Sequence, residues 1–168
     1  YISPSQIFQF NYFAYCTYHA KKYNHDFVRY FHNIIIEDSP IIDLSVLSPK
    51  YFRKRLNSLK CAKDLFRGIC LRNYPYPDVI KGFSQLIADN SNIKIVSFSN
   101  CDCNKGLTEL ANVSKDARKK KKAFGVTYWD LSYNRFNNFS YFSSVIENST
   151  EPIKYLNLNG CNICDEDS

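Results

Sequence analysis

Residues 126–136, VTYWDLSYNRF, and residues 153–163, IKYLNLNGCNI, follow one pattern that decides the fold. Both stretches place apolar side chains at positions 1, 4, 6 and 11 and an Asn or Cys at position 9. Two further copies, residues 66–76 and 93–103, place Tyr and Cys at that ninth position. The four copies thus begin at Phe66, Ile93, Val126 and Ile153, in steps of 27, 33 and 27. This period is typical of a solenoid, in which each unit buries its apolar face against its neighbours.

The spacing of the pattern has a physical cause. Alternate residues of a strand face opposite sides, so Val96 and Phe98 point together into the core while Ser97 points away. The ninth position enters the turn, where a side chain can satisfy backbone groups as the chain leaves the strand. Asn134 can do this with its amide, and Cys101 and Cys161 with their thiols.

Helices are expected between the strands, because apolar residues there recur at helical spacing. The first begins at Pro77 and Asp78, and the last has Asn138 as N-cap and ends before Pro152. The apolar faces of the three helices comprise Val79, Phe83, Leu86 and Ile87, then Leu107, Leu110 and Ala111, then Phe139, Phe142, Val145 and Ile146. Stacking such strand–helix units predicts an α/β horseshoe with parallel strands on the concave face and helices on the convex face.

The N-terminal third is less regular. A helix is expected over residues 26–36, and Ile41, Leu44 and Val46 fit the first half of the pattern as a degenerate repeat. The following helix would present Phe52, Leu56 and Leu59. Ile7, Phe10 and Tyr12 are a weaker match for an earlier copy still. We therefore divide the chain into a degenerate or flanking helical segment, 1–40, and a repeat region, 41–168, truncated at the C-terminal end.

Composition favours a globular chain of about one domain, with 45% hydrophobic and 16% aromatic residues among 168. No run approaches the roughly 18 apolar residues needed to cross a bilayer, and residues 1–10 lack the basic lead and apolar centre of a secretory leader. The seven cysteines are therefore expected to be reduced, in a soluble cytoplasmic protein. Methionine is absent, even from position 1, so we expect a fragment of a longer protein.

The stretches 126–136 and 153–163 resemble leucine-rich repeats, and the unit length near 27 with Asn or Cys in the turn is similar to the ribonuclease-inhibitor class. Within this class, short sequences such as Leu131-Ser-Tyr-Asn134 are similar to the repeats of the CARMIL cytoskeletal linkers. Trp129 and Phe98 stand where leucine is usual, and Tyr74 where Asn is usual. The resemblance covers residues 66–163 well, and it implies a protein-binding scaffold with a cytoskeletal partner and no catalysis.

Metal and catalytic sites are not indicated. Cys101-Asp-Cys103 and Cys161-Asn-Ile-Cys164 contain metal-ligand spacings, but the two pairs would lie two units apart, about 10 Å, which is too far to share one zinc ion. Three histidines, His19, His25 and His32, lack an accompanying nucleophile, oxyanion site or phosphate loop. We expect no enzyme activity, no cofactor and no metal.

The formal charge of +6 is concentrated in Arg118, Lys119, Lys120, Lys121 and Lys122, a basic run that we expect to be a loop inserted between two repeats. Two alternatives to the scaffold stay open. One is an adaptor that binds an anionic lipid or nucleic acid through this run, although nucleic acid is disfavoured because no aromatic lies within it. The other is the recruiting arm of a larger enzyme.

The partner-binding surface is expected on the concave strand face, between the buried positions. One predicted column comprises Ser45, Cys70, Ser97, Asp130 and Asn157. A second comprises Arg72, Ser99, Ser132 and Asn159, with Tyr128 and Tyr155 beside them. Tyrosine and arginine are the residue types that most often carry interface energy. We therefore expect a partner to lie across the units that contain Tyr128 and Tyr155.

Overall fold

The computed structural model describes residues 1–36, 41–43, 45, 56–62, 64–74 and 77–163. The fold is α/β, and its main sheet has five parallel strands in the order β1-β2-β3-β4-β6. The strands are β1 (Ile41–Asp43), β2 (Gly68–Arg72), β3 (Ile95–Ser99), β4 (Tyr128–Asp130) and β6 (Tyr155–Asn157). A second, two-stranded parallel sheet pairs β5 (Arg135–Phe136) with β7 (Asn162–Ile163).

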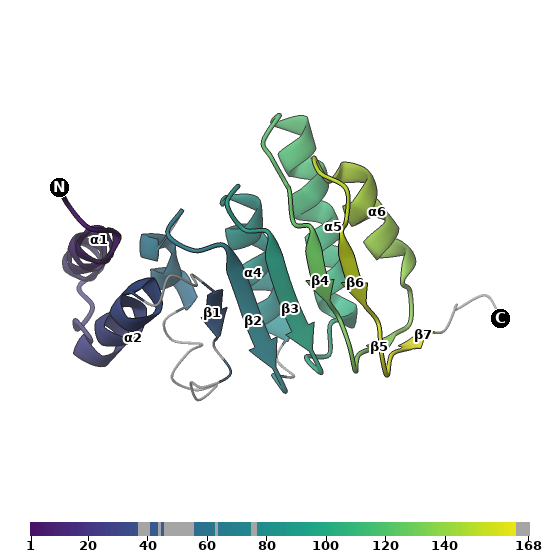
Figure 1. The fold of residues 1–168 in the computed structure, drawn as a ribbon, viewed down its shortest axis with the longest axis horizontal. Coiled ribbons are helices and arrows are strands. Elements are labelled where there is room, and N and C mark those ends of the chain that lie inside the picture. Colours follow the sequence, from purple (N-terminus) through teal and green to yellow (C-terminus); the bar gives the residue numbers. More distant parts are fainter. Residues whose placement is uncertain (37–40, 44, 46–55, 63, 75–76, 164–168) are drawn as a thin grey trace.

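Helices connect the strands and lie on one face of the main sheet, so its other face is free of helices in Figure 1. These are α4 (Pro77–Ala88), α5 (Asn104–Lys119) and α6 (Ser140–Asn148), between the strands as the sequence predicts. The N-cap of α6 is Phe139 and not the predicted Asn138, whose Oδ1 accepts from the Ser140 backbone N–H at 3.1 Å. A 3₁₀ helix, η2 (Leu56–Ala62), precedes β2. The units that begin with β2, β3 and β4 are therefore each a strand followed by a helix. In the described chain no helix is long and apolar enough to cross a membrane.

The strand register repeats with the predicted period. Ile42, Ile69, Val96, Trp129 and Leu156 pair in turn across the sheet, and the only step that departs from the others is the longer one between Val96 and Trp129. The predicted alignment of the degenerate repeat is wrong by two positions, because Ile41 pairs with Gly68 and not with Phe66. A shift of two positions keeps each side chain on the same face of the strand, so the alternation of apolar residues could not exclude it. Leu44, Val46 and Phe52 lie outside the described residues.

The core lies between the sheet and its helices. The side chains of Ile69, Leu71, Val96, Phe98, Trp129 and Leu131 are fully buried. Rings cross the layer: Phe83 on α4 lies 6.2 Å from Phe98, and Phe142 on α6 meets Trp129 edge to face at 5.3 Å. Helices α4 and α5 approach so closely that a Cβ added to Gly106 would lie 2.1 Å from Ile80 Cγ2. Each such buried apolar side chain stabilises the fold by about 1.5–3 kcal/mol.

The N-terminal segment consists of α1 (Pro4–Tyr18) and α2 (His25–Ile36). The suggested early repeat at Ile7, Phe10 and Tyr12 is therefore wrong, because these residues lie in α1. A capping box of Ser3 and Gln6 begins this helix. Its buried residues Phe8, Tyr12 and Cys16 recur at every fourth position. The rings of Phe8 and Tyr12 pack against α2. Helical spacing thus explains the aromatic crowding of this region.

The turns after β3, β4 and β6 confirm the predicted role of the ninth position. The Asn134 amide donates to the carbonyl of Phe98 (2.7 Å), and the Cys101 and Cys161 thiols donate to those of Leu71 (3.5 Å) and Leu131 (3.0 Å). Each acceptor is the same strand position in the preceding unit. Asn134 Oδ1 also accepts from the backbone N–H groups of Cys101 (2.9 Å) and Cys103 (3.4 Å). These side chains therefore hold neighbouring units together.

The residue before each ninth position has a left-handed backbone, with φ of 56° at Asn73, 49° at Asn100, 57° at Tyr133 and 65° at Gly160. Asn tolerates this conformation and glycine adopts it freely, whereas tyrosine does so at a cost. A Cβ at Gly160 would also lie 2.5 Å from the ring of Tyr133. Glycine at residue 160 is therefore favoured by the turn conformation, and the aromatic ring beside it leaves no room for a side chain.

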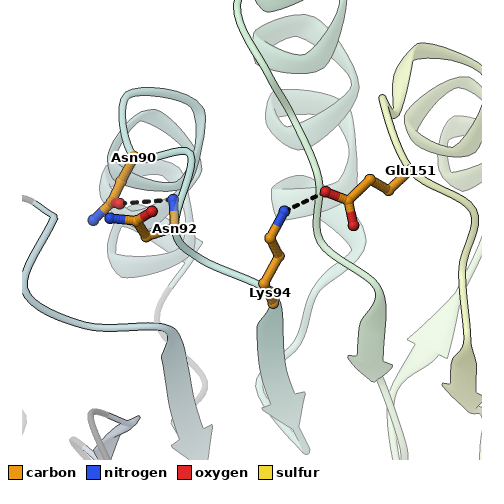
Figure 2. Close-up of polar contacts among 4 residues, drawn as sticks. All are labelled: Asn90, Asn92, Lys94 and Glu151. Atoms are coloured by element: carbon orange, nitrogen blue, oxygen red, sulfur yellow. Dashed lines mark hydrogen bonds and ion pairs between the residues drawn. The ribbon is translucent and has the colours of Figure 1, made fainter.

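Polar side chains fix the opposite edge, where the strands begin. Lys94 Nζ forms an ion pair with Glu151 Oε1 (2.6 Å), and Asn90 Oδ1 accepts from the Asn92 backbone N–H (3.2 Å). Figure 2 shows both contacts. The ion pair links the unit of β3 to the segment before β6 and spans the intervening Gly125. A side chain at residue 125 would meet Lys94 Nζ at 2.7 Å, so glycine leaves room for this link.

Candidate functional site

The candidate site is the helix-free face of the main sheet (Figure 1). The strand register places three columns of side chains across this face. The structure corrects the first predicted column, because Asp43 and not Ser45 pairs with Cys70. Ser45 belongs to the second column, where its hydroxyl accepts from the Arg72 backbone N–H at 2.9 Å. The third column comprises Ile41, Gly68, Ile95, Tyr128 and Tyr155.

Much of the first column is engaged in hydrogen bonds within the chain. Asp130 Oδ1 accepts from the Ser132 backbone N–H (3.1 Å), and Asn157 Oδ1 accepts from that of Asn159 (3.0 Å). Asp43 Oδ1 likewise accepts from the Ser45 backbone N–H (2.9 Å). Asp130 and Asn157 are only half-exposed, and these bonds shape the turns that follow the strands.

The prediction that Ser97 and Ser132 are exposed is wrong, because they are only 8% and 3% exposed. The Ser97 hydroxyl donates to Asp130 Oδ2 (3.2 Å), and the Ser132 hydroxyl bonds that of Ser99 (2.9 Å), itself half-buried. Adjacent strands lie about 4.8 Å apart, so short side chains are covered by longer neighbours. Sequence alternation identifies the face on which a side chain lies but not its height above the sheet.

Tyr128 and Tyr155 are the prominent groups on this face. They occupy paired positions on β4 and β6, are 44% and 49% exposed, and stack with ring centroids 5.9 Å apart and planes 25° apart. The side chains of Arg72 and Asn159 are also exposed. Tyr133, which sequence reasoning missed as a surface residue, is 65% exposed at the end of β4. Its position directly before the ninth position of the pattern, in the turn, could have indicated this exposure.

The basic run is not wholly a loop. Arg118 and Lys119 form the last turn of α5, and Lys120, Lys121 and Lys122 follow it. All five side chains are exposed. Arg118 Nη1 donates to the backbone carbonyl of Glu147 on α6 at 3.1 Å, and Lys122 Nζ lies 3.9 Å from Asp89 Oδ1. Part of the longer repeat step is therefore taken up by extra helix.

The inner cysteines are packing residues. Cys101 and Cys103 are fully buried, and burial raises the pKa of the Cys101 thiol to about 11 and that of Cys103 well above its usual value. Such thiols stay protonated at neutral pH, whereas zinc binds thiolates. Within the described ranges, no group of three or more His, Cys, Asp or Glu residues is arranged to hold a metal ion. Cys164 lies outside those ranges.

The three histidines make separate contacts in the helical segment. His32 Nδ1 and the Ser5 hydroxyl are 2.5 Å apart, His19 packs on Tyr15 and Tyr18, and His25 packs on Tyr23. The His32 contact links α2 to α1, whereas His19 lies at the C-cap of α1 and His25 at the start of α2.

The sequence matches no protein-family model, and no curated protein matches it.

Proposed function

We propose that this chain is a non-catalytic binding module, a leucine-rich-repeat solenoid that holds a partner protein on the helix-free face of its sheet. The regular strand register and the repeated turn donors support the solenoid, because each unit contacts the next in the same way. The cytoskeletal setting follows from the resemblance to CARMIL-type linkers alone.

The stacked pair Tyr128 and Tyr155 is the observation that carries the proposal. Two half-exposed aromatic rings side by side offer a large, rigid contact area, and their stacking has already restricted their rotation. Each tyrosine also has a hydroxyl that can hydrogen-bond a partner. Arg72 and Asn159 add polar groups on the same face, as expected around an aromatic centre.

The face suits a folded surface or an extended segment of a partner better than a small molecule. Its groups are spread over several parallel strands, and the first-column carboxylate of Asp130 is already bonded within the chain. Partner contact is therefore assigned to Tyr128, Tyr155, Arg72 and Asn159, while Asp130 and Asn157 position the turns beneath them.

A photo-crosslinking experiment tests the proposal. A photoreactive amino acid at residue 155 should capture a partner that is not captured from residue 141, which is an exposed tyrosine on α6. The purified partner should then bind the double variant Tyr128→Ala/Tyr155→Ala at least tenfold more weakly, which is about 1.4 kcal/mol. The matched control Tyr141→Ala should leave the affinity within twofold. Equal affinity of the double variant and the control would refute the proposed surface.

A further inference from the structure

A hollow of about 400 Å³ lies between the C-terminal ends of α5 and α6. Figure 1 shows these two helix ends at the top of the molecule. Arg118, Lys121 and Lys122 line the hollow from one side, and residues 147–150 line it from the other. We call this the α5–α6 hollow. It lies at the edge where the strands begin, away from the residues that follow the strands, and it is open to solvent.

The positive charge at this hollow is largely unneutralised. Over the described part of the chain, no carboxylate forms an ion pair with Arg118 or Lys121, and Lys122 reaches Asp89 only at 3.9 Å. Arg118 donates to an uncharged carbonyl, that of Glu147, which orients the guanidinium without cancelling its charge. Three cationic side chains line one hollow, so a bound anion would reduce their mutual repulsion.

The chemistry of the lining favours phosphate. A guanidinium presents paired donors that match phosphate oxygens, lysines add point charges, and Thr150 adds a hydroxyl. The lining contains no aromatic ring on which a nucleobase could stack. One carboxylate, that of Glu147, opposes anion binding. We propose that the α5–α6 hollow binds a compact, multiply phosphorylated ligand that has no nucleobase. This inference does not rest on the proposed protein-binding surface.

The end of α5 offers a variant that removes charge without disturbing the fold. The backbone N–H of Lys122 donates to the carbonyl of Ala117 (2.8 Å), and the backbone N–H of Lys121 donates to the carbonyl of Arg118 (3.0 Å). These two hydrogen bonds form a Schellman motif. Lys121 is its left-handed residue, with φ of 54°. Glycine is preferred at this position, so Lys121→Gly removes the charge and keeps the cap.

Calorimetric titration with inositol hexakisphosphate at physiological ionic strength tests the site. We expect Arg118→Gln/Lys121→Gly to weaken binding at least tenfold. The control Lys115→Gln/Lys119→Gln removes the same charge from exposed positions of α5 that do not line the hollow, and it should weaken binding less than twofold. Glu147→Gln should strengthen binding. Equal losses in the two double variants, or no binding by the wild type, would overturn the proposal.

Further arms distinguish the source of the phosphates. Sedimentation with phosphatidylcholine vesicles that contain phosphatidylinositol bisphosphate, competed by the soluble probe, would indicate a lipid headgroup. Binding to the soluble probe without sedimentation would indicate a free phosphorylated molecule, and either result upholds the site. The third ligand is a single-stranded oligonucleotide. If it binds more tightly than the soluble probe, and if both double variants weaken its binding equally, the proposed site is overturned in favour of diffuse attraction to nucleic acid.

Discussion

The repeats that contain β4 and β6 have matched sequences but bury their apolar residues to different extents. Trp129 and Phe136 in the first are fully buried, whereas their counterparts Leu156 and Ile163 are 38% and 45% exposed. The unit of β4 is covered by the unit that follows it, and β6 is the last strand of the main sheet in the described chain. The pattern within a repeat therefore sets the direction of its side chains, while its neighbour determines their burial.

The largest effect is expected at Trp129, in the covered repeat. Trp129→Ala should lower the free energy of unfolding by about 3–5 kcal/mol, because a fully buried ring is removed. The indole N–H has no acceptor within the described residues, so Trp129→Phe should cost clearly less. Urea unfolding followed by circular dichroism measures both. An alanine variant as stable as the wild type would contradict the packing of β4 against α6.

The next effect is expected at Asn134, which connects the units. Asn134→Ala should cost about 2–3 kcal/mol, since it leaves buried backbone groups at Phe98, Cys101 and Cys103 without their partner. Asn134→Cys should recover part of this loss, because cysteine fills the same position at residues 101 and 161. The same urea unfolding measures the three proteins, and a cysteine variant no better than alanine would show that a thiol does not replace the amide.

A smaller effect is expected at Leu156, in the uncovered repeat. Leu156→Ala should cost about 1 kcal/mol, because this side chain retains solvent contact in the folded state. The comparison with Trp129→Ala, measured under the same conditions, is the direct test of coverage. A loss of about 3 kcal/mol or more, as for a buried leucine, would mean that Leu156 is covered in solution, which would require a further element over β6.

The smallest effect is expected at the ion pair of Lys94 and Glu151 (Figure 2). The hydrogen bond and charge of Lys94 lower the pKa of the Glu151 carboxyl. A lowered folded-state pKa adds stability above the ordinary pKa of Glu, and this stability is lost as the pH falls through the folded-state value. The pair is open to solvent, so Glu151→Gln should not measurably change the unfolding midpoint at neutral pH. Midpoints recorded from pH 7 to pH 3 check this, and a large acid-dependent loss that the variant abolishes would contradict it.

Repetition explains what could be predicted from the sequence. The strands at Val96, Trp129 and Leu156 and the helices between them were predicted because each unit shows the same alternation and helical spacing. The turn donors at Asn134 and Cys101 followed from the same comparison. In the degenerate copy at Ile41 the register was misplaced by two positions, because such a shift keeps each side chain on the same face and alternation does not exclude it.

The candidate site was predicted less completely, because it depends on contacts across strands. The exposure of Tyr128 and Tyr155 follows from alternation, but their stacking needs the register of β4 against β6. Ser97 and Ser132 are covered by neighbouring side chains and hydrogen-bonded within the chain, which depends on how far those neighbours extend above the sheet. The α5–α6 hollow joins residues 118–122 to residues 147–150, which no local pattern connects.

The connection between α5 and β4 shows how such a chain can acquire new chemistry. The step from Val96 to Trp129 is longer than the steps before and after it, yet the strands pair in unbroken register on both sides. The surplus is accommodated at the helix end, so length and charge can vary there independently of the sheet. Helix-to-strand connections of this kind are therefore natural grafting points, where an added peptide would gain a fixed position without requiring the rest of the molecule to be redesigned.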